Sequence, residues 1–441
     1  MLRMRKAILL INIMVLLLKT SVFSQDTVSV SVDTIPTKKE KHYKKLEDIQ
    51  QKYLRFVDKK NREFPFALPA VAYNKYDGVQ IGAVLINLKQ PVKHVDFTAS
   101  LLYGIKSKKV NGTANVDYYI KIKKGVVSQI KPGIRFQSFT YADFVKPLKY
   151  YAIHPEIVIN FNHRTEKLEK ISHHVIFRSH VILQKDITFN YGTSTFDKDT
   201  LNRFYVNEFQ YHFKREDKNF PVDASLNFEQ SKQFLKTYFI ANSFIRYQLK
   251  NYNTGVHLRF FVGGFLWRKN QFFFNNLTYA DYGFSANGRT GSQDYFYNDF
   301  YFNRNGQDGF GANQITKTDG FLKTVAPKTV IGQTPNWMLA FNLKLDFPIK
   351  YVPIKFFFDL AYSYNNKYGN GAPLPIKSFQ YDAGLMFSFF DEGFEIYLPF
   401  LVSKDYKTYY KANAPKFGQR ITFLLDLHKI ELHKKIRDLR F

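Results

Sequence analysis

Histidines are the residues of this sequence whose type and spacing point most directly to metal chemistry. His163, His173 and His174 lie close together in the chain, and His174, Arg178 and His180 would share one strand face, because strand side chains alternate between faces. A metal site is one interpretation, since imidazole is a common metal ligand. Histidines that face water or an interface explain the same pattern, and no cysteine is available to add a thiolate ligand. We therefore predict neither a metal site nor a cofactor.

Catalytic motifs that can be recognised from their spacing are missing. The sequence has no His-Glu-x-x-His, which would place zinc ligands and a general base on one helix, and no Gly-x-Ser-x-Gly elbow for a serine nucleophile. Four acids of the stretch 269–335 could line a site, although acids in a solvated loop are ordinary: Asp281, Asp294, Asp299 and Asp308. We predict that the protein is not an enzyme.

The elements that would position these residues are strands. Between Trp337 and Leu345, every second residue is a large apolar one, and the residues between them are mostly polar or small. This period of two predicts a strand, and a strand of about 9 to 11 residues can cross a bilayer when tilted. The strands that we predict span 66–74, 78–88, 95–105, 112–123, 127–139, 150–162, 171–184, 199–214, 221–231, 235–249, 254–268, 336–346, 354–365, 378–390, 392–403 and 417–427.

The connections between the strands alternate in length. Phe390 to Gly393 makes a tight turn, whereas 366–377 and 403–416 are longer and rich in Lys, Tyr, Asn and Pro. Outer-membrane barrels have short periplasmic turns and long outer loops. The fold class that we predict is all-β: a transmembrane antiparallel up-and-down β-barrel of about sixteen strands at residues 66–441.

Composition and the N-terminal segment agree with a barrel in the outer membrane. Aromatic residues make up 18% of the chain, with 46 Phe and 30 Tyr, which suits a lipid-facing sheet with aromatic girdles. Residues 1–24 have a basic start and a short apolar core, as in a secretory signal peptide. Residues 25–65 are dense in Lys and Glu and predict a periplasmic linker with one short amphipathic helix.

The net charge of +27 raises the question of the partner. Nucleic acid is the usual suspicion for a basic chain, but the lysines are spread through turns and strands, and the signal peptide directs the chain out of the cytoplasm. We predict no nucleic-acid partner. Outer-membrane lipid and lipopolysaccharide phosphates are the counter-charges that we expect, together with a possible periplasmic or surface protein partner.

Several local stretches resemble the superfamily of outer-membrane insertases, two-partner secretion transporters and bacterial surface antigens. Residues 73–82 (YNKYDGVQIG) look like the opening of that barrel, 342–349 (NLKLDFPI) and 355–359 (KFFFD) like its strands twelve and thirteen, and 394–399 (FEIYLP) like its penultimate strand. The long connection 269–335, between strands eleven and twelve, matches the dominant sixth outer loop of the family. The family's soluble periplasmic repeats and its Arg-Gly loop motif are missing from this sequence.

The resemblance implies an ion pair between this loop and the barrel interior. Asp359 matches the family's strand-thirteen acid, and Phe357 lies beside it on the same face. A buried carboxylate needs a cation, and Arg304 or Arg289 of the loop could supply it. The hypothesis is that one of these arginines holds the loop inside the barrel. The alternative is an outward-facing loop with surface arginines.

The resemblance further implies an integral outer-membrane barrel of the surface-antigen type. We expect it to act in transport, assembly or surface display through its lumen and its sixth loop. Two alternatives stay open at this point. One is a passive, loop-gated pore, and the other is a barrel enzyme that acts on lipid or peptide at the outer rim.

Overall fold

The computed structural model describes residues 65–430, apart from gaps at 88–93, 144–145, 162–163, 167–168, 191–194, 218–219, 248–253, 270–281, 305–308, 328, 330, 348–352 and 365–377. The predicted signal peptide and the predicted helix of residues 25–65 lie outside this part. Within the part of the chain that the structure describes, no helix is both long and apolar enough to cross a membrane.

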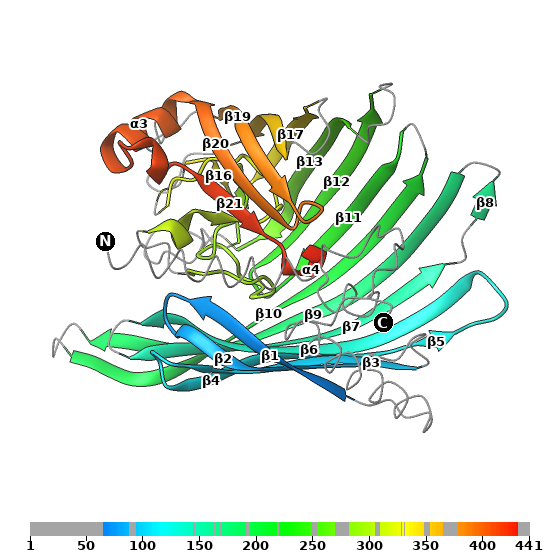
Figure 1. Ribbon diagram of the computed structural model, residues 1–441, viewed down its shortest axis with the longest axis horizontal. Coiled ribbons are helices and arrows are strands. Elements are labelled where there is room, and N and C mark those ends of the chain that lie inside the picture. Colours follow the sequence, from blue (N-terminus) through cyan, green and yellow to red (C-terminus); the bar gives the residue numbers. More distant parts are fainter. Residues whose placement is uncertain are drawn as a thin grey trace, which may run out of the picture. The chain divides into compact units, whose positions relative to one another are not determined.

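One antiparallel sheet dominates the structure, with its strands in chain order (Figure 1). Among the described residues, the sheet has nineteen strands. Of these, β5 and β8 are short pieces that continue β4 and β7 after a break, and β15 comes from the long loop, which leaves the sixteen consecutive strands that the sequence predicts. The strands of the first half are β1 (Pro65–Asn74), β2 (Gly78–Asn87), β3 (Val95–Gly104), β4 (Lys109–Tyr118), β5 (Ile120–Lys121), β6 (Val127–Asp143), β7 (Pro147–Phe161), β8 (Arg164–Glu166), β9 (Glu169–Asn190) and β10 (Thr195–Glu216).

The second half continues the same antiparallel meander. Its strands are β11 (Val222–Gln230), β12 (Phe234–Arg246), β13 (Gly255–Arg268), β17 (Trp337–Asp346), β18 (Ile354–Ser363), β19 (Phe379–Phe389), β20 (Phe394–Val402) and β21 (Thr422–Leu425). β9 and β10 have 22 residues each. Because a tilted strand needs only about 9 to 11 residues to cross the hydrocarbon, this hairpin extends beyond it, and it is longer than the sequence pattern predicts.

The two faces of the sheet have opposite chemistry, and the apolar face is the exposed one. On β17, Trp337 and Leu339 are 43% and 40% exposed, whereas Asn342 and Lys344 are buried at 3% and 4%. β18 repeats the pattern, with an exposed Phe358. A soluble protein buries the apolar face of a sheet, whereas a membrane barrel turns it toward lipid and keeps polar groups inside. The predicted all-β barrel architecture is thus confirmed at the level of the strands.

The last predicted strand, 417–427, is only partly correct. The predicted outer connection before it contains helix α3 (Lys404–Asn413), and a 3-10 turn, η4 (Phe417–Gln419), precedes the four-residue β21. The chain then enters helix α4 (Leu427–Ile430). In the turn before β21, the backbone N–H of Lys416 donates to Oε1 of Gln419 at 3.1 Å, and the backbone N–H of Gln419 donates to the backbone oxygen of Lys416 at 3.0 Å. Only Thr422 to Leu425 then extend as a strand.

The two ends of the sheet do not pair with each other among the described strands. β1 pairs with β2, and β21 pairs antiparallel with β20 and parallel with β15 of the long loop. The predicted closure by direct pairing of the first and last strands is therefore not seen. The physical reason is that β15 occupies the edge of β21 that such a pairing would need.

Candidate functional site

The candidate site is the segment between β13 and β17, residues 282–334, which we call the plug segment. It begins with β14 (Phe284–Ser285) and ends with β16 (Gln333–Thr334), which pair antiparallel with each other. Between them lie the 3-10 turn η3 (Phe310–Asn313) and β15 (Gln314–Ile315). Gly320 lets two parts of the segment approach closely, since a Cβ there would lie 2.4 Å from the backbone oxygen of Ala286. The predicted long loop thus folds into a compact unit.

The plug segment lies inside the curve of the sheet. Its side chains reach inward-facing residues on strands from the first hairpin to the last strand. These contacts join Asn303 to Tyr76, Asn298 to Arg135, Tyr297 to Tyr150, Phe296 to His180, Tyr295 to Glu229, Phe284 to Phe261, Phe321 to Tyr397 and Phe302 to Phe423. One segment can touch all these strands only if the sheet curves around it. The outward-facing loop, which the sequence left as an alternative, is therefore wrong.

Asp359 of β18 forms an ion pair with the plug segment, and its partner is Lys323. The Nζ of Lys323 lies 2.8 Å from Oδ2 of Asp359, and both side chains are fully buried. Asn342 of β17 donates to the other Asp359 oxygen at 2.9 Å. Lys323 also donates to the backbone oxygen of Phe321 and lies 5.6 Å from the ring centre of Phe357. The contact therefore joins two neighbouring strands to the middle of the plug segment.

The predicted site residues are brought together only in part. Asp359 and Phe357 lie on one buried face, as predicted, and both contact the plug segment. Arg289 and Arg304 are also buried, at 5% and 7% exposure, but neither supplies the cation for Asp359. The prediction of an arginine partner is wrong, because each arginine is already paired with an acid of the plug segment itself.

The two arginines hold the plug segment in shape. Arg289 donates to both carboxylate oxygens of Asp319, at 3.0 and 3.1 Å, which is a bidentate pair. Arg304 donates to Asp294 at 2.8 Å and to the backbone oxygen of Asp299. Of the acids that could have lined a rim site, Asp294 is thus paired with Arg304 through its carboxylate, and Asp299 contacts Arg304 through its backbone oxygen. The other two, Asp281 and Asp308, lie outside the described residues.

A second buried ion pair contacts the plug segment from β11 and β12. Lys236 of β12 and Glu229 of β11 lie 3.1 Å apart with no exposed surface. The hydroxyl of Tyr295 donates to Glu229 and also contacts Lys236. A buried ion pair is stable only when its remaining hydrogen-bonding capacity is satisfied. Because Tyr295 belongs to the plug segment, Oε2 of Glu229 has this hydrogen bond only when the plug segment is in place.

The predicted histidine cluster is divided between separate contacts. His180 stacks on Phe296 of the plug segment at 4.1 Å, and its Nδ1 lies 2.9 Å from that of His154. His174 packs against His212 at 4.6 Å between ring centres, and His163 lies outside the described residues. Within the described ranges, no group of three or more His, Cys, Asp or Glu residues could hold a metal ion. Histidine here joins the plug segment to β9.

Sequence reasoning missed Lys323, although a local signal exists. Residues 321–326 (FLKTVA) are the most apolar run in the plug segment, and Lys323 is its only charge. A lone lysine within an apolar run is buried only with a partner. The partner lies 36 residues further along the chain, at Asp359, and no local pattern links the two positions.

Sixteen consecutive antiparallel strands, an apolar outer face and a polar interior filled by a long loop define an outer-membrane β-barrel. No protein-family model matches the sequence, and no curated protein is similar to it.

Solved structures with a similar fold have very different sequences. CdiB from Acinetobacter baumannii is 11% identical, with a TM-score of 0.37, over 78% of this chain and 57% of CdiB. BamA from Haemophilus ducreyi lacking POTRA domains 1-3 is 11% identical, with a TM-score of 0.46, over 82% of this chain and 69% of that one. The copper transporter OprC is 6% identical, with a TM-score of 0.32, over 76% and 56%. The chain thus spans a little over half the length of CdiB, and the similarity concerns the fold alone.

Proposed function

We propose that the protein is an integral outer-membrane barrel for transport, assembly or surface display, and that the plug segment closes its lumen at rest. The plug segment has to shift before a cargo can enter the lumen. Outer-membrane lipid and lipopolysaccharide surround the barrel in this proposal, and a periplasmic or surface protein is the partner that would release the plug segment.

One observation carries the proposal. A single segment contacts inward-facing residues from the β1–β2 hairpin to β21, and the Lys323–Asp359 ion pair within it has no exposed surface. Removing one partner of a buried ion pair typically costs about 3 to 5 kcal/mol. A loop held only at the surface would rest on exposed pairs worth about 0 to 1 kcal/mol. Moving the plug segment would separate Lys323 from Asp359, so the ion pair supports a resting state that is closed.

Planar-bilayer conductance tests the proposal. Because Ser285 and Gln333 are paired, residues 286–332 can be replaced by a short Gly-Ser turn without stretching the ends of β13 and β17. We expect almost no conductance from the full chain and a large, stable conductance from this deletion variant. A matched control shortens the connection 366–377 between β18 and β19 and is expected to stay closed.

The outcomes separate the proposal from its alternatives. Frequent spontaneous opening of the unaltered protein would favour a passive, loop-gated pore. Absence of conductance in the deletion variant would contradict closure by the plug segment and favour a structural or display role. Hydrolysis of lipid or peptide that is lost on a single Asp or His change would favour a rim enzyme. Proteins that co-purify with the full chain from outer membranes would identify the partner.

A further inference from the structure

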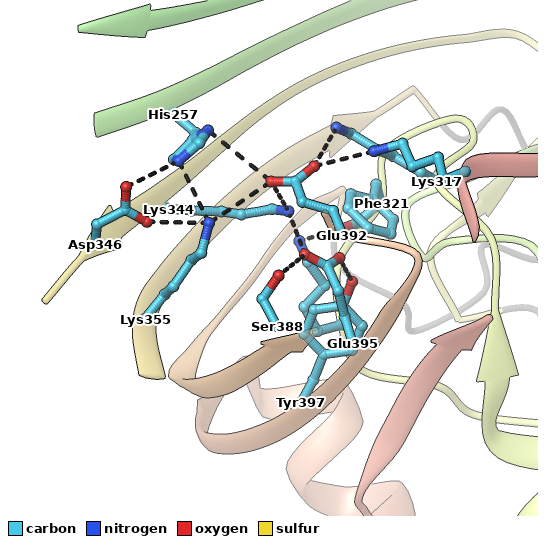
Figure 2. A network of polar contacts seen from close by, with 12 residues as sticks. His257, Lys317, Phe321, Lys344, Asp346, Lys355, Ser388, Glu392, Glu395 and Tyr397 are labelled. Atoms are coloured by element: carbon cyan, nitrogen blue, oxygen red, sulfur yellow. Dashed lines mark hydrogen bonds and ion pairs between the residues drawn. The ribbon is translucent and has the colours of Figure 1, made fainter. Parts of the chain in front are cut away.

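We infer that the barrel carries a binding site for a small oxyanion, a phosphate or carboxylate group, in a cavity between the plug segment and the strand ends around Glu392. The site does not depend on the proposed function. The cavity measures about 50 Å³ and lies among side chains of β12, β13, β17, the plug segment and the β19–β20 turn: Asn242, His257, Arg259, Lys317, Lys344 and Glu392. Figure 2 shows the charged residues that surround Glu392.

Cations outnumber acids around this cavity. Glu392 lies within 4 Å of four lysines: Lys317 at 3.7 Å, Lys344 at 3.3 Å, Lys355 at 3.8 Å and Lys429 at 3.1 Å. Two further acids neutralise part of the charge of these lysines. Lys344 pairs with Glu395 at 2.8 Å, and Lys355 pairs with Asp346 at 3.0 Å. Among the Lys, Arg and acidic residues that line the cavity, Arg259, Lys317 and Lys344 thus carry positive charge and Glu392 carries negative charge, while Asp223 also acts on Lys317 from outside the lining. The surplus positive charge favours an anion.

Arg259 of β13 is a cation of this cavity whose guanidinium also lies 5.7 Å from the ring centres of Phe261 and Phe321. Its side chain is buried, at 4% exposure, and Nη1 donates to Asn342 at 2.9 Å, but Nη2 has no hydrogen-bond partner. The acids that act on it electrostatically, Asp319 and Asp359, are paired with Arg289 and Lys323. A buried guanidinium with a free N–H is costly unless it meets an acceptor. An oxyanion in the adjoining cavity would supply that acceptor.

Lys317 is the second cation that an anion would engage. Its ion pair with Glu392 is long, at 3.7 Å, and its side chain is about one third exposed, at 33%. Burial, followed by the charge of Lys344, lowers the pKa of Lys317 to about 8. A bound anion would therefore favour the charged form of the Lys317 ammonium group.

The size of the cavity limits the ligand. A water molecule needs about 10 to 15 Å³ by this measure, so a cavity of about 50 Å³ accommodates a group of four or five heavy atoms. That is the size of a phosphate, a sulfate or the carboxylate end of a longer molecule. A nucleotide or a sugar does not fit within it.

Calorimetric titration of the purified full chain in detergent with inorganic phosphate at pH 7 and low salt tests the site, and acetate serves as the second probe. Loss of one charged hydrogen bond costs about 1.5 to 3 kcal/mol, so Arg259→Gln and Lys317→Gln should each weaken phosphate binding by about 10- to 100-fold. Lys407→Gln on the exposed side of α3 is the matched control and should leave binding within about twofold. Binding of phosphate but not acetate would identify a tetrahedral anion, and binding of both would identify carboxylates as ligands too.

The pH dependence adds an independent readout. Phosphate affinity should fall as the pH rises through about 8, where Lys317 loses its proton, and Lys317→Arg should keep binding at pH 9 because arginine stays charged. Heat-dependent mobility in gels verifies that each variant is folded. Equal affinity of the unaltered protein and Arg259→Gln, or no binding of either probe up to about 10 mM, would overturn the inference. Neither result would bear on closure of the lumen by the plug segment.

Discussion

At the scale of single residues, the Lys323–Asp359 pair is the contact whose loss should matter most. Lys323→Met leaves Asp359 buried and charged, with Asn342 as a remaining hydrogen-bond donor. We expect the free energy of unfolding to fall by about 3 to 5 kcal/mol. Combining Lys323→Met with Asp359→Asn should cost less than the two changes added together, because the double variant no longer leaves Asp359 as a buried carboxylate without its cation. Urea unfolding in lipid micelles measures all three variants.

The control for this prediction is an exposed ion pair of the same length. Lys106 and Asp143 lie 2.9 Å apart with side chains that are 54% and 31% exposed. Lys106→Met should therefore change the unfolding free energy by no more than about 1 kcal/mol. If Lys323→Met proved as mild as Lys106→Met, the buried pair would not hold the plug segment.

The raised pKa of Asp299 predicts that the docking of the plug segment inside the sheet depends on pH. Burial, followed by repulsion from Asp294, raises the pKa of Asp299 from 3.8 to about 7. At pH values between about 4 and about 7, the carboxyl group of Asp299 therefore keeps its proton in the folded state and has lost it in the unfolded chain. Stability falls where the native state binds more protons, so the plug segment should become easier to dislodge as the pH rises from about 4 to about 7, with no further loss from this group above pH 7.

Limited proteolysis of the plug segment across this pH range measures the effect. Asp299→Asn should remove the slope between pH 4 and pH 7, because the amide does not titrate. Asp294→Asn, by contrast, also removes the partner of Arg304 and should raise cleavage at every pH. A slope that persists unchanged in Asp299→Asn would assign the pH dependence to another group.

At the scale of elements, the predicted tight turn between β19 and β20 has an unfavourable backbone conformation. Phe390, Asp391 and Glu392 all have positive φ, at 55°, 57° and 67°, a region that favours glycine. Asp391 is exposed, so Asp391→Gly should relieve strain and raise the unfolding free energy by about 0.5 to 1 kcal/mol. Asp405→Gly within α3 should act in the opposite direction, because glycine is about 1 kcal/mol worse than alanine in a helix. Destabilisation by Asp391→Gly would contradict a strained turn.

The strands could be predicted from the sequence because the alternation of apolar and polar residues indicates which face of the sheet meets hydrocarbon. β17 and β18 begin and end within two residues of the predicted 336–346 and 354–365. β21 could not be predicted correctly, because its extent depends on pairing with β15, more than a hundred residues earlier in the chain. The partner of Asp359 could not be predicted for the same reason. Local periodicity contains no information on which distant residue meets a buried charge.

At the scale of the whole molecule, the plug segment joins the two ends of the sheet. The backbone N–H of Lys75, after β1, donates to the backbone oxygen of Phe302 at 2.9 Å. β15 pairs with β21 at the other end, and Gln314 of β15 accepts a hydrogen bond from the backbone N–H of Phe302 at 2.9 Å. An unpaired strand edge is costly in lipid. The plug segment therefore both fills the interior and satisfies the edge of the last strand, so its movement should be coupled to exposure of that edge.

A disulfide between the plug segment and β21 tests this coupling. Ile315 and Leu424 are partners in the parallel register and pack in one buried cluster, and neighbouring strands lie about 4.8 Å apart, within the range that a disulfide spans. The sequence has no cysteine, so Ile315→Cys with Leu424→Cys introduces the only thiols. If opening requires β15 to leave β21, oxidation should abolish the openings that high voltage or urea induces in planar bilayers, and reductant should restore them. Each variant with a single cysteine should open equally often after oxidation and after addition of reductant. Openings that persist after complete oxidation would mean that the lumen opens while β15 stays paired with β21. The rest of the plug segment would then be the part that moves.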